Sequence, residues 1–129
     1  MKKNRKYGLI GKNIDYSFSK KFFSEKFEKE NLNCIYSNFD IENISHLKSI
    51  LQDDTINGFN VTIPYKEEIL KFLDEIDEAA KTIGAVNTIK KINNKYIGFN
   101  TDFIGFEKSL IGLIENKKPE NALILGSGG

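Results

Sequence analysis

Hydrophobic residues switch between two spacings in the first half of the chain. Residues 6–11, 33–40 and 56–63 form short apolar runs of the kind found in β-strands. Residues 19–32 and 43–51 instead repeat apolar side chains at helical spacing. Alternating strands and helices predict a mostly parallel sheet with helices on both faces and right-handed crossovers.

End signals define two of the predicted helical regions. Three phenylalanines share one face of the first helix: Phe22, Phe23 and Phe27. Ser19 is the expected N-cap of this helix. Residues 64–84 predict one or two helices, and Gly84 is placed to close the last of them.

The later pattern adds antiparallel pairing to the sheet. Residues 85–92 and 95–100 flank the dipeptide "NN", which is typical of a hairpin turn, so the sheet should be mixed. Residues 101–118 predict a long helix that Pro119 ends. Its expected buried stripe consists of five apolar residues: Phe103, Phe106, Leu110, Leu113 and Ile114.

The final residues, "NALILGSGG", read as a buried strand that runs into a glycine-rich turn. Such a strand needs a neighbouring strand and a following helix. We therefore expect the sequence to break off at the junction with a second domain.

Composition narrows the class of protein. The 129 residues suit one domain, and 40% hydrophobic residues supply a core. The 19 basic and 18 acidic residues give no electrostatic case for nucleic acid or an anionic membrane. The single cysteine, Cys34, excludes an internal disulfide and favours a cytoplasmic protein. His46 has no second ligand at metal spacing, so no metal site is predicted.

The stretch "GFNVTIPYK" places polar residues on an apolar strand. Asn60 and Thr62 share one face of the strand, opposite Phe59, Val61 and Ile63. Polar side chains at the carboxyl end of a strand point to the crevice where α/β proteins bind ligands. Thr62 is therefore a candidate ligand contact.

Lys66 follows this strand in an unusual position. Pro64 suits the first position of a helix, so Lys66 is expected in the first turn. There the helix dipole disfavours a cation and favours the neutral amine, which suits proton transfer. The alternative is a surface lysine whose charge is offset by Glu67 and Glu68.

Four other side chains are candidates with structural alternatives. Ser17 and Ser19 near a helix start could hold a carboxylate, or simply cap the helix. Asn87, on an apolar strand, could meet a ligand or tether a loop. Asp102 could serve the first turn of its helix, or face Lys66 across a cleft as an acid/base pair.

Four stretches resemble, in order, the substrate-domain motifs of the shikimate dehydrogenase family: "GLIG…YSFS", "GFNVTIPYK", "IGAVNTI" and "GFNTDFIGF". "LILGSGG" is similar to the opening of the family's NADP-binding domain. The resemblance spans Tyr7 to Gly129. It implies NADPH-dependent reduction of the small molecule 3-dehydroshikimate to shikimate, a step of chorismate and aromatic amino acid biosynthesis.

The resemblance also implies roles for individual residues. It assigns the substrate carboxylate to two hydroxyls, Ser17 and Ser19. It assigns the ring hydroxyls to three polar side chains: Thr62, Asn87 and Asp102. Lys66 becomes the catalytic acid/base, and Asp102 orients it. Three glycines become the start of the pyrophosphate turn: Gly126, Gly128 and Gly129.

The same resemblance divides the chain. Residues 1–103 would form the substrate-binding domain and residues 104–118 a connecting helix. Residues 119–129 would form the first strand and turn of a Rossmann domain that binds most of the NADP. This chain alone would then be inactive, and the choice between monomer and homodimer stays open.

Departures from the family pattern keep two alternatives open. Where the family has "PxxHSxSP", this sequence has Asn13, Tyr16 and Lys20 at the proline, histidine and second proline. Phe103 replaces the glycine of "NTDG". The first alternative is a quinate/shikimate dehydrogenase with another ring or cofactor preference. The second is a shikimate-binding module without catalysis.

Overall fold

A computed structural model describes residues 4–126 as a six-stranded sheet in the order β2-β1-β3-β5-β6-β4. The strands are β1 (Arg5–Gly11), β2 (Cys34–Asp40), β3 (Ile56–Val61), β4 (Glu75–Ile76), β5 (Thr88–Ile92) and β6 (Lys95–Phe99). β1 pairs in parallel with β2 and β3, and β4 with β6, whereas the β3–β5 and β5–β6 pairs are antiparallel. The predicted mixed, mostly parallel sheet is confirmed.

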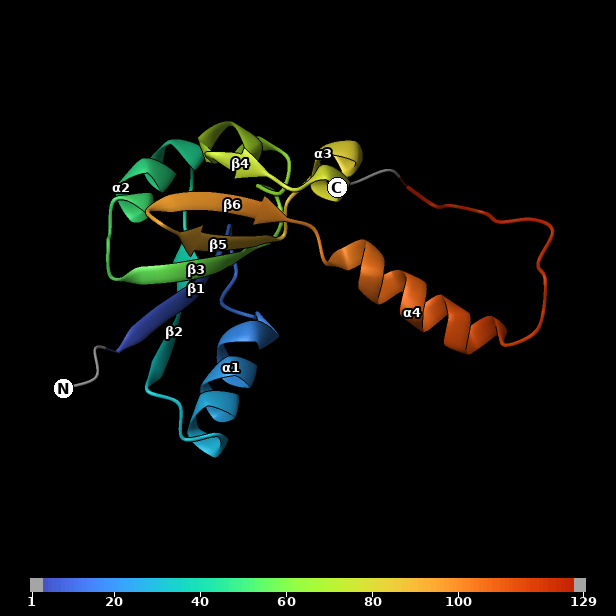
Figure 1. The fold of residues 1–129 in the computed structure, drawn as a ribbon, viewed down its shortest axis with the longest axis horizontal. Coiled ribbons are helices and arrows are strands. Elements are labelled where there is room, and N and C mark those ends of the chain that lie inside the picture. The colour runs from blue at the N-terminus through green and yellow to red at the C-terminus, as the bar shows by residue number, and fades with distance from the viewer. Residues whose placement is uncertain (1–3, 127–129) are drawn as a thin grey trace.

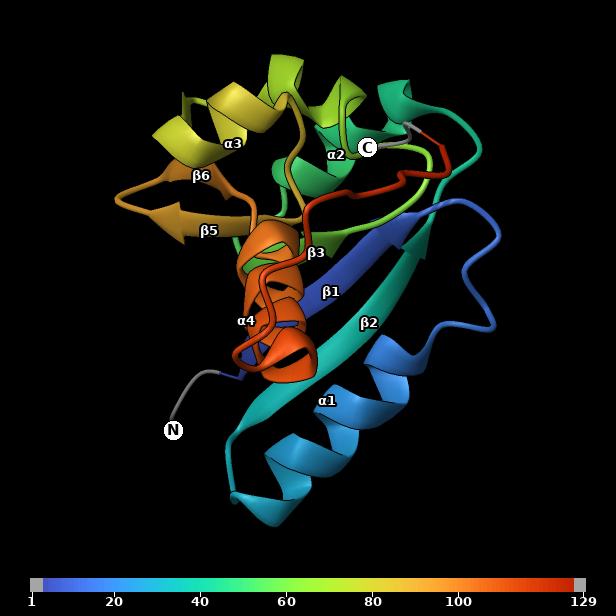
Figure 2. The same cartoon turned by 90° about the vertical axis from the view of Figure 1, so that its right-hand side faces the viewer.

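Helices lie on both faces of this sheet (Figures 1 and 2). The α-helices are α1 (Phe18–Lys29), α2 (Leu47–Leu51), α3 (Glu78–Ile83) and α4 (Asp102–Ile114), and the 3₁₀ helices are η1 (Ile44–His46) and η2 (Glu68–Phe72). α1 lies on one side, and α2 and α3 lie on the other. This arrangement confirms the predicted α/β fold class.

Alternation along the strands builds two cores. Ile10 and Val61 point to the face that carries α2, η2 and α3, where they join the larger buried cluster. Leu9 and Tyr36 point to the opposite face and join a smaller cluster against which Phe23 and Phe27 of α1 pack. The sheet is thus fixed from both sides, and its carboxyl edge carries the polar motifs.

The first helix differs in detail from its prediction. α1 begins at Phe18, and Ser17 is its N-cap instead of Ser19. Of the three phenylalanines expected on the buried face, Phe22 is 44% exposed, while Phe23 and Phe27 pack against the core. The N-cap lies two residues earlier than predicted, where the Ser17 Oγ accepts from the Ser19 N–H at 3.3 Å.

Residues 64–84 form less helix than predicted. The segment divides into η2, the short strand β4 and α3, because the backbone between the two helices pairs with β6. The Asp74 N–H donates to the Tyr96 carbonyl at 3.0 Å, and the Tyr96 N–H donates to the Asp74 carboxylate at 2.7 Å. Gly84 closes α3 with φ +78°, as predicted.

The hairpin prediction is confirmed. Asn93 and Asn94 connect β5 to β6 with φ values of 49° and 61°. Two consecutive positive φ angles belong to the type I′ turn, whose twist matches that of the flanking strands. Asparagine tolerates this left-handed conformation better than most residues.

The buried stripe predicted for the long helix is wrong. α4 starts at Asp102 but has no buried residue, and Phe106 and Leu113 are 69% and 79% exposed. Figure 1 shows why: α4 projects away from the sheet, and no described element covers its apolar side. Its last residue is Ile114, five residues before Pro119.

Within residues 4–126 no helix is both long and apolar enough to cross a bilayer.

The strand expected near the end of the sequence is absent from residues 119–126. Leu123, Ile124 and Leu125 are exposed instead of buried. A strand requires a hydrogen-bonded neighbour, and no described strand lies beside this segment.

Gly8 is expected to be essential for packing in the central strand. A Cβ at this position would meet the Phe39 ring and lie 2.6 Å from the Ser37 carbonyl oxygen of the adjacent strand. Gly8→Ala should therefore destabilise the protein by about 1–3 kcal/mol in chemical denaturation. The control is Gly105→Ala in α4, where a Cβ meets nothing and should stabilise the helix by about 0.5–1 kcal/mol. Equal effects of the two substitutions would contradict this packing account.

Candidate functional site

An ion pair joins two of the predicted site residues. The Lys66 Nζ donates to the Asp102 Oδ2 at 2.5 Å, although the residues are 36 positions apart in the sequence. Lys66 lies in the turn after β3, and Asp102 is the first residue of α4, directly after β6. Their side chains are 19% and 55% exposed, so the pair is open to a ligand from one side. The facing arrangement that the sequence left open is present.

The helical position expected for Lys66 is wrong. The residues after Pro64 form a turn, and η2 begins only at Glu68, with Glu67 as its N-cap. An argument from the dipole of a long helix therefore does not apply to this lysine. The position of Lys66 is instead set by its carbonyl, which accepts from the Val86 N–H at 2.8 Å, and by Asp102. The Lys66 turn is thereby tied to the segment just before β5 that carries Asn87, which lies outside the strand predicted for it.

Asn87 holds the carboxylate in place. Its Nδ2 donates to the Asp102 Oδ1 at 3.0 Å and to the Thr101 Oγ1 at 2.9 Å. Its Oδ1 accepts from the Thr101 N–H at 2.9 Å. Asn87 is thus a loop tether, which was one of its two predicted roles, and it also contacts the ion pair directly. One Asp102 oxygen faces Asn87 while the other faces Lys66.

Asn100 caps the helix that Asp102 begins. Its Oδ1 accepts from the Asp102 N–H at 2.9 Å and from the Phe103 N–H at 3.4 Å. Its Nδ2 donates to the Ala85 carbonyl at 3.1 Å, and the residue is buried. Because Asn100 caps the helix, the Asp102 side chain remains available to Lys66.

Thr62 lies at the end of β3 with its hydroxyl unused. Its N–H donates to the Ile10 carbonyl at 2.9 Å, and its carbonyl accepts from the Tyr65 N–H at 3.0 Å. The methyl group of its side chain lies against Gly11, where a Cβ would approach within 2.6 Å. Among the described residues no hydrogen bond engages the Thr62 hydroxyl, which leaves it available to a ligand.

Ser17 and Ser19 lie at the start of α1. Ser17 is the N-cap, so the capping alternative holds for this residue. The Ser19 N–H donates to the Ser17 Oγ at 3.3 Å. Neither serine contacts Lys66 or Asp102 directly within the described part of the chain.

Tyr36 is a functional candidate that sequence reasoning missed. Its hydroxyl donates to the Asn60 Oδ1 at 2.9 Å. Burial raises the pKa of Tyr36 to about 12. The phenol therefore stays protonated and keeps its capacity to donate at neutral pH.

Tyr36 should make stability fall between pH 10 and pH 12. An unfolded tyrosine loses its proton near pH 10.0, whereas folded Tyr36 retains it up to about pH 12 because its pKa is raised. The contribution is complete below the unfolded pKa and is lost as the pH rises through the folded one, about 3 kcal/mol at most. Urea titrations of wild type and Tyr36→Phe below pH 10 and near pH 12 test this. The difference between their unfolding free energies should shrink with pH, and a constant difference would contradict the assignment.

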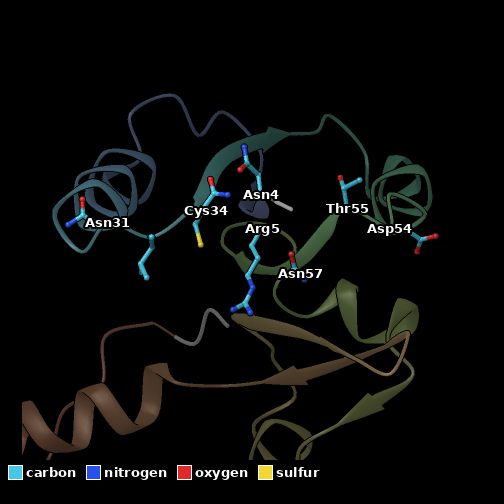
Figure 3. A pocket seen from close by; sticks show the side chains of 9 residues that line it. Asn4, Arg5, Asn31, Cys34, Asp54, Thr55 and Asn57 are labelled. Carbon is cyan, nitrogen blue, oxygen red and sulfur yellow. The ribbon is translucent and has the colours of Figure 1, made fainter. Parts of the chain in front are cut away.

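A surface depression lies elsewhere, at the amino-terminal end of β1 and β2. It has a volume of about 670 Å³, and Figure 3 shows its polar lining, which includes Arg5, Asp54 and Asn57. Cys34 lies at its wall with the sulfur in view (Figure 3). None of the predicted site residues lines it. Catalytic and binding candidates therefore gather at the other end of these strands.

The glycines assigned to the cofactor are only partly described. Gly126 has φ +104°, a conformation that suits glycine in a tight turn. Gly128 and Gly129 lie outside the described residues.

Relatives with similar sequences share one name. The chain is 43% identical over 126 residues to a shikimate dehydrogenase (NADP(+)) of Staphylococcus haemolyticus, covering 96% of this chain and 47% of that protein. It is 47% identical over 132 residues to the enzyme of the same name from Methanococcus maripaludis, covering 98% and 46%. The chain thus spans about half the length of the curated relatives it matches.

Solved structures agree in fold. A shikimate dehydrogenase from Aquifex aeolicus superposes with a TM-score of 0.79 at 42% identity, covering 88% of this chain and 44% of that one. The enzyme from Thermus thermophilus, solved with NADP(H) and shikimate, gives 0.76 at 30% identity, covering 83% and 41%. The family model for the shikimate dehydrogenase substrate binding domain matches residues 9–89. The chain therefore belongs to the shikimate dehydrogenase family and carries its substrate-binding domain.

Proposed function

We propose that the protein of which this chain is part is an NADP-dependent shikimate dehydrogenase that reduces 3-dehydroshikimate to shikimate. The observation that carries the proposal is the Lys66–Asp102 ion pair, with Asn87 bonded to the same carboxylate. A lysine that is held by a carboxylate at the end of the strands can transfer a proton to a carbonyl oxygen. Relatives named shikimate dehydrogenase support the choice of substrate.

Lys66 is the acid in the reducing direction. Its ammonium group gives a proton to the carbonyl oxygen, which becomes the new hydroxyl of the product. The hydride that adds to the carbonyl carbon would be supplied by NADPH, the reduced form of the cofactor, when it is bound. The resulting neutral amine regains a proton from solvent, because the Lys66 side chain is 19% exposed. In the oxidising direction the same amine accepts the hydroxyl proton.

Asp102 and Asn87 position the acid and the ring. The Asp102 carboxylate accepts from Lys66 and fixes the direction of its Nζ, while Asn87 prevents the carboxylate from rotating. Thr62, Asn87 and Asp102 bind the ring hydroxyls. The Thr62 hydroxyl is free for this purpose, whereas Asn87 shares its amide between protein and substrate.

The hydroxyls of Ser17 and Ser19 bind the substrate carboxylate. Both lie at the first turn of α1, where the positive end of the helix dipole also favours an anion. Ser17 already caps α1, and its proton is free because its oxygen is the acceptor in that bond. A substrate carboxylate is thereby held at one end, with the reacting carbon toward Lys66.

Residues 1–103 act as the substrate-binding domain, and residues 104–118 connect it to an NADP-binding domain that residues 119–129 begin. Gly126, Gly128 and Gly129 form the start of its pyrophosphate turn. The exposed apolar side of α4 is consistent with a connecting element that further protein covers. We place the protein in the cytoplasm, where a lone cysteine such as Cys34 stays reduced.

Comparing shikimate with quinate tests the substrate choice. The full-length gene product is assayed with NADP⁺ and each acid, and NADPH formation is followed. We expect turnover of shikimate and little or none of quinate, because Thr62, Asn87 and Asp102 carry the family's pattern. Faster turnover of quinate would indicate a paralogue with another ring preference, and no turnover of either would contradict dehydrogenase function.

A further inference from the structure

Tyr36 is held rigidly beneath the start of α1. The residue lies in the middle of β2 and is 4% exposed. Its ring stacks on Phe23 of α1, with centroids 4.7 Å apart and an interplanar angle of 17°. A ring fixed on a strand and stacked on a helix can direct its hydroxyl to only a small region. That region lies between α1 and β3.

The hydroxyl makes its hydrogen bond to β3. It donates to the Asn60 Oδ1 at 2.9 Å. A hydroxyl has one proton to donate and two lone pairs to accept. Since the proton goes to Asn60, the Tyr36 hydroxyl fixes which end of that amide faces it.

The bond to Asn60 also fixes the other end of that amide. Because the Oδ1 faces Tyr36, the Nδ2 group points away from it. Within the described residues the Nδ2 makes no hydrogen bond, so both of its protons are available. Asn60 and Thr62 are on the same strand face, so the amide joins the predicted ligand side of β3.

A row of polar groups then continues across the sheet. Asn60 is the register partner of Thr88 in the antiparallel β3–β5 pair. The Thr88 Oγ1 donates to the Asn87 Oδ1 at 3.1 Å, and Asn87 in turn contacts Asp102. Through Asn60, Tyr36 therefore reaches the strand pair that leads to the Lys66–Asp102 pair.

We infer that Tyr36 is a positioning residue for substrate binding: its hydroxyl sets the orientation of the Asn60 amide toward the bound acid. This inference rests on the proposed function. When the acid binds, Tyr36 keeps its bond to the Asn60 Oδ1, so the Nδ2 protons of Asn60 stay turned away from Tyr36 and available to the ligand. Tyr36 itself touches no reacting atom, so it should affect binding more than the chemical step.

The test is Tyr36→Phe in the full-length gene product, which keeps the ring stack and removes only the hydroxyl. KM for shikimate should rise about tenfold, the effect of one lost hydrogen bond, while kcat changes less than about twofold. The control is Tyr96→Phe, which removes a similarly buried hydroxyl that donates to the Leu51 carbonyl at 2.7 Å. It should lower stability without changing KM.

A double substitution shows whether Tyr36 acts by positioning its partner or by making the whole site more rigid. If Tyr36 acts through Asn60, Tyr36→Phe combined with Asn60→Ala should raise KM by less than the product of the single effects. Asn60→Ala, which leaves the aromatic stack intact, should raise KM in the same direction and serves if Tyr36→Phe fails to fold. Three outcomes would overturn the inference. They are an unchanged KM in Tyr36→Phe, an equal rise of KM in Tyr96→Phe, and a KM of the double variant that rises by the full product of the two single effects. Absence of turnover by the wild type would overturn the proposed function and this inference together.

Discussion

Lys66→Ala is expected to lower kcat of the full-length gene product by about 10³-fold, within the range for a lost general acid or base. The substitution removes the only group of the Lys66–Asp102 pair that can donate a proton to a carbonyl oxygen. KM should change far less, because the hydroxyls of Ser17, Ser19 and Thr62 remain. Steady-state kinetics with 3-dehydroshikimate and NADPH measures both parameters.

A second lysine provides a matched control. The Lys91 Nζ pairs with the Asp54 Oδ1 at 2.8 Å, and its side chain is 11% exposed, which resembles the environment of Lys66. Lys91 lies on β5, away from the Lys66 turn, so Lys91→Ala should leave kcat within about twofold of wild type. Equal losses from the two substitutions would show that removing any half-buried cation damages the enzyme, and Lys66 would lose its assigned role.

Asp102→Asn should lower kcat by about 10²-fold, because the substituted amide no longer carries the charge that holds the ammonium. The shape of the side chain is kept, and Asn100 still caps α4, so the fold should persist. Asp102 also binds substrate in the proposed scheme, so KM should rise as well. Circular dichroism and steady-state kinetics of the variant measure the two effects separately.

Asp54→Asn is the corresponding control for this carboxylate. It removes the negative charge from the ion pair with Lys91. This pair is a direct contact, like the Lys66–Asp102 pair, but it lies outside the candidate site. We expect kinetic constants near those of wild type. If Asp102→Asn behaved like Asp54→Asn, the carboxylate would serve only the helix terminus, the simpler of its two predicted roles.

Local signals were sufficient for most of the sheet. The strands β1, β2 and β3 appear where short apolar runs predict them, and the two asparagines of "NN" adopt the positive φ angles that a tight hairpin requires. Gly84 ends α3 for the same reason, since its left-handed conformation favours glycine. In each case the information lies within a few residues of the element.

Tertiary pairing decided the elements that were mispredicted. Helical spacing in residues 64–84 was real, but pairing with β6 and the bonds between Asp74 and Tyr96 interrupt the helix. Apolar spacing in α4 indicates a face to be covered, and the spacing cannot say what covers it. A sequence pattern records the chemistry of a face, whereas its burial depends on a neighbour.

The residues of the candidate site were also predicted only in part from the sequence. Lys66, Asn87 and Asp102 come from three motifs, and the fold brings them into one hydrogen-bonded group. Tyr36 was missed because a tyrosine in an apolar strand is indistinguishable from a core residue until its hydroxyl partners are known. The helix-dipole argument for Lys66 failed because the chain after Pro64 forms a turn.

The most direct test of the account is the reaction itself in the full-length gene product. NADPH oxidation with 3-dehydroshikimate is followed by absorbance, and the shikimate formed is quantified in the same sample. We expect one shikimate for each NADPH consumed, with the rate lost in Lys66→Ala and kept in Lys91→Ala. No shikimate from the wild type, or an undiminished rate in Lys66→Ala, would contradict it.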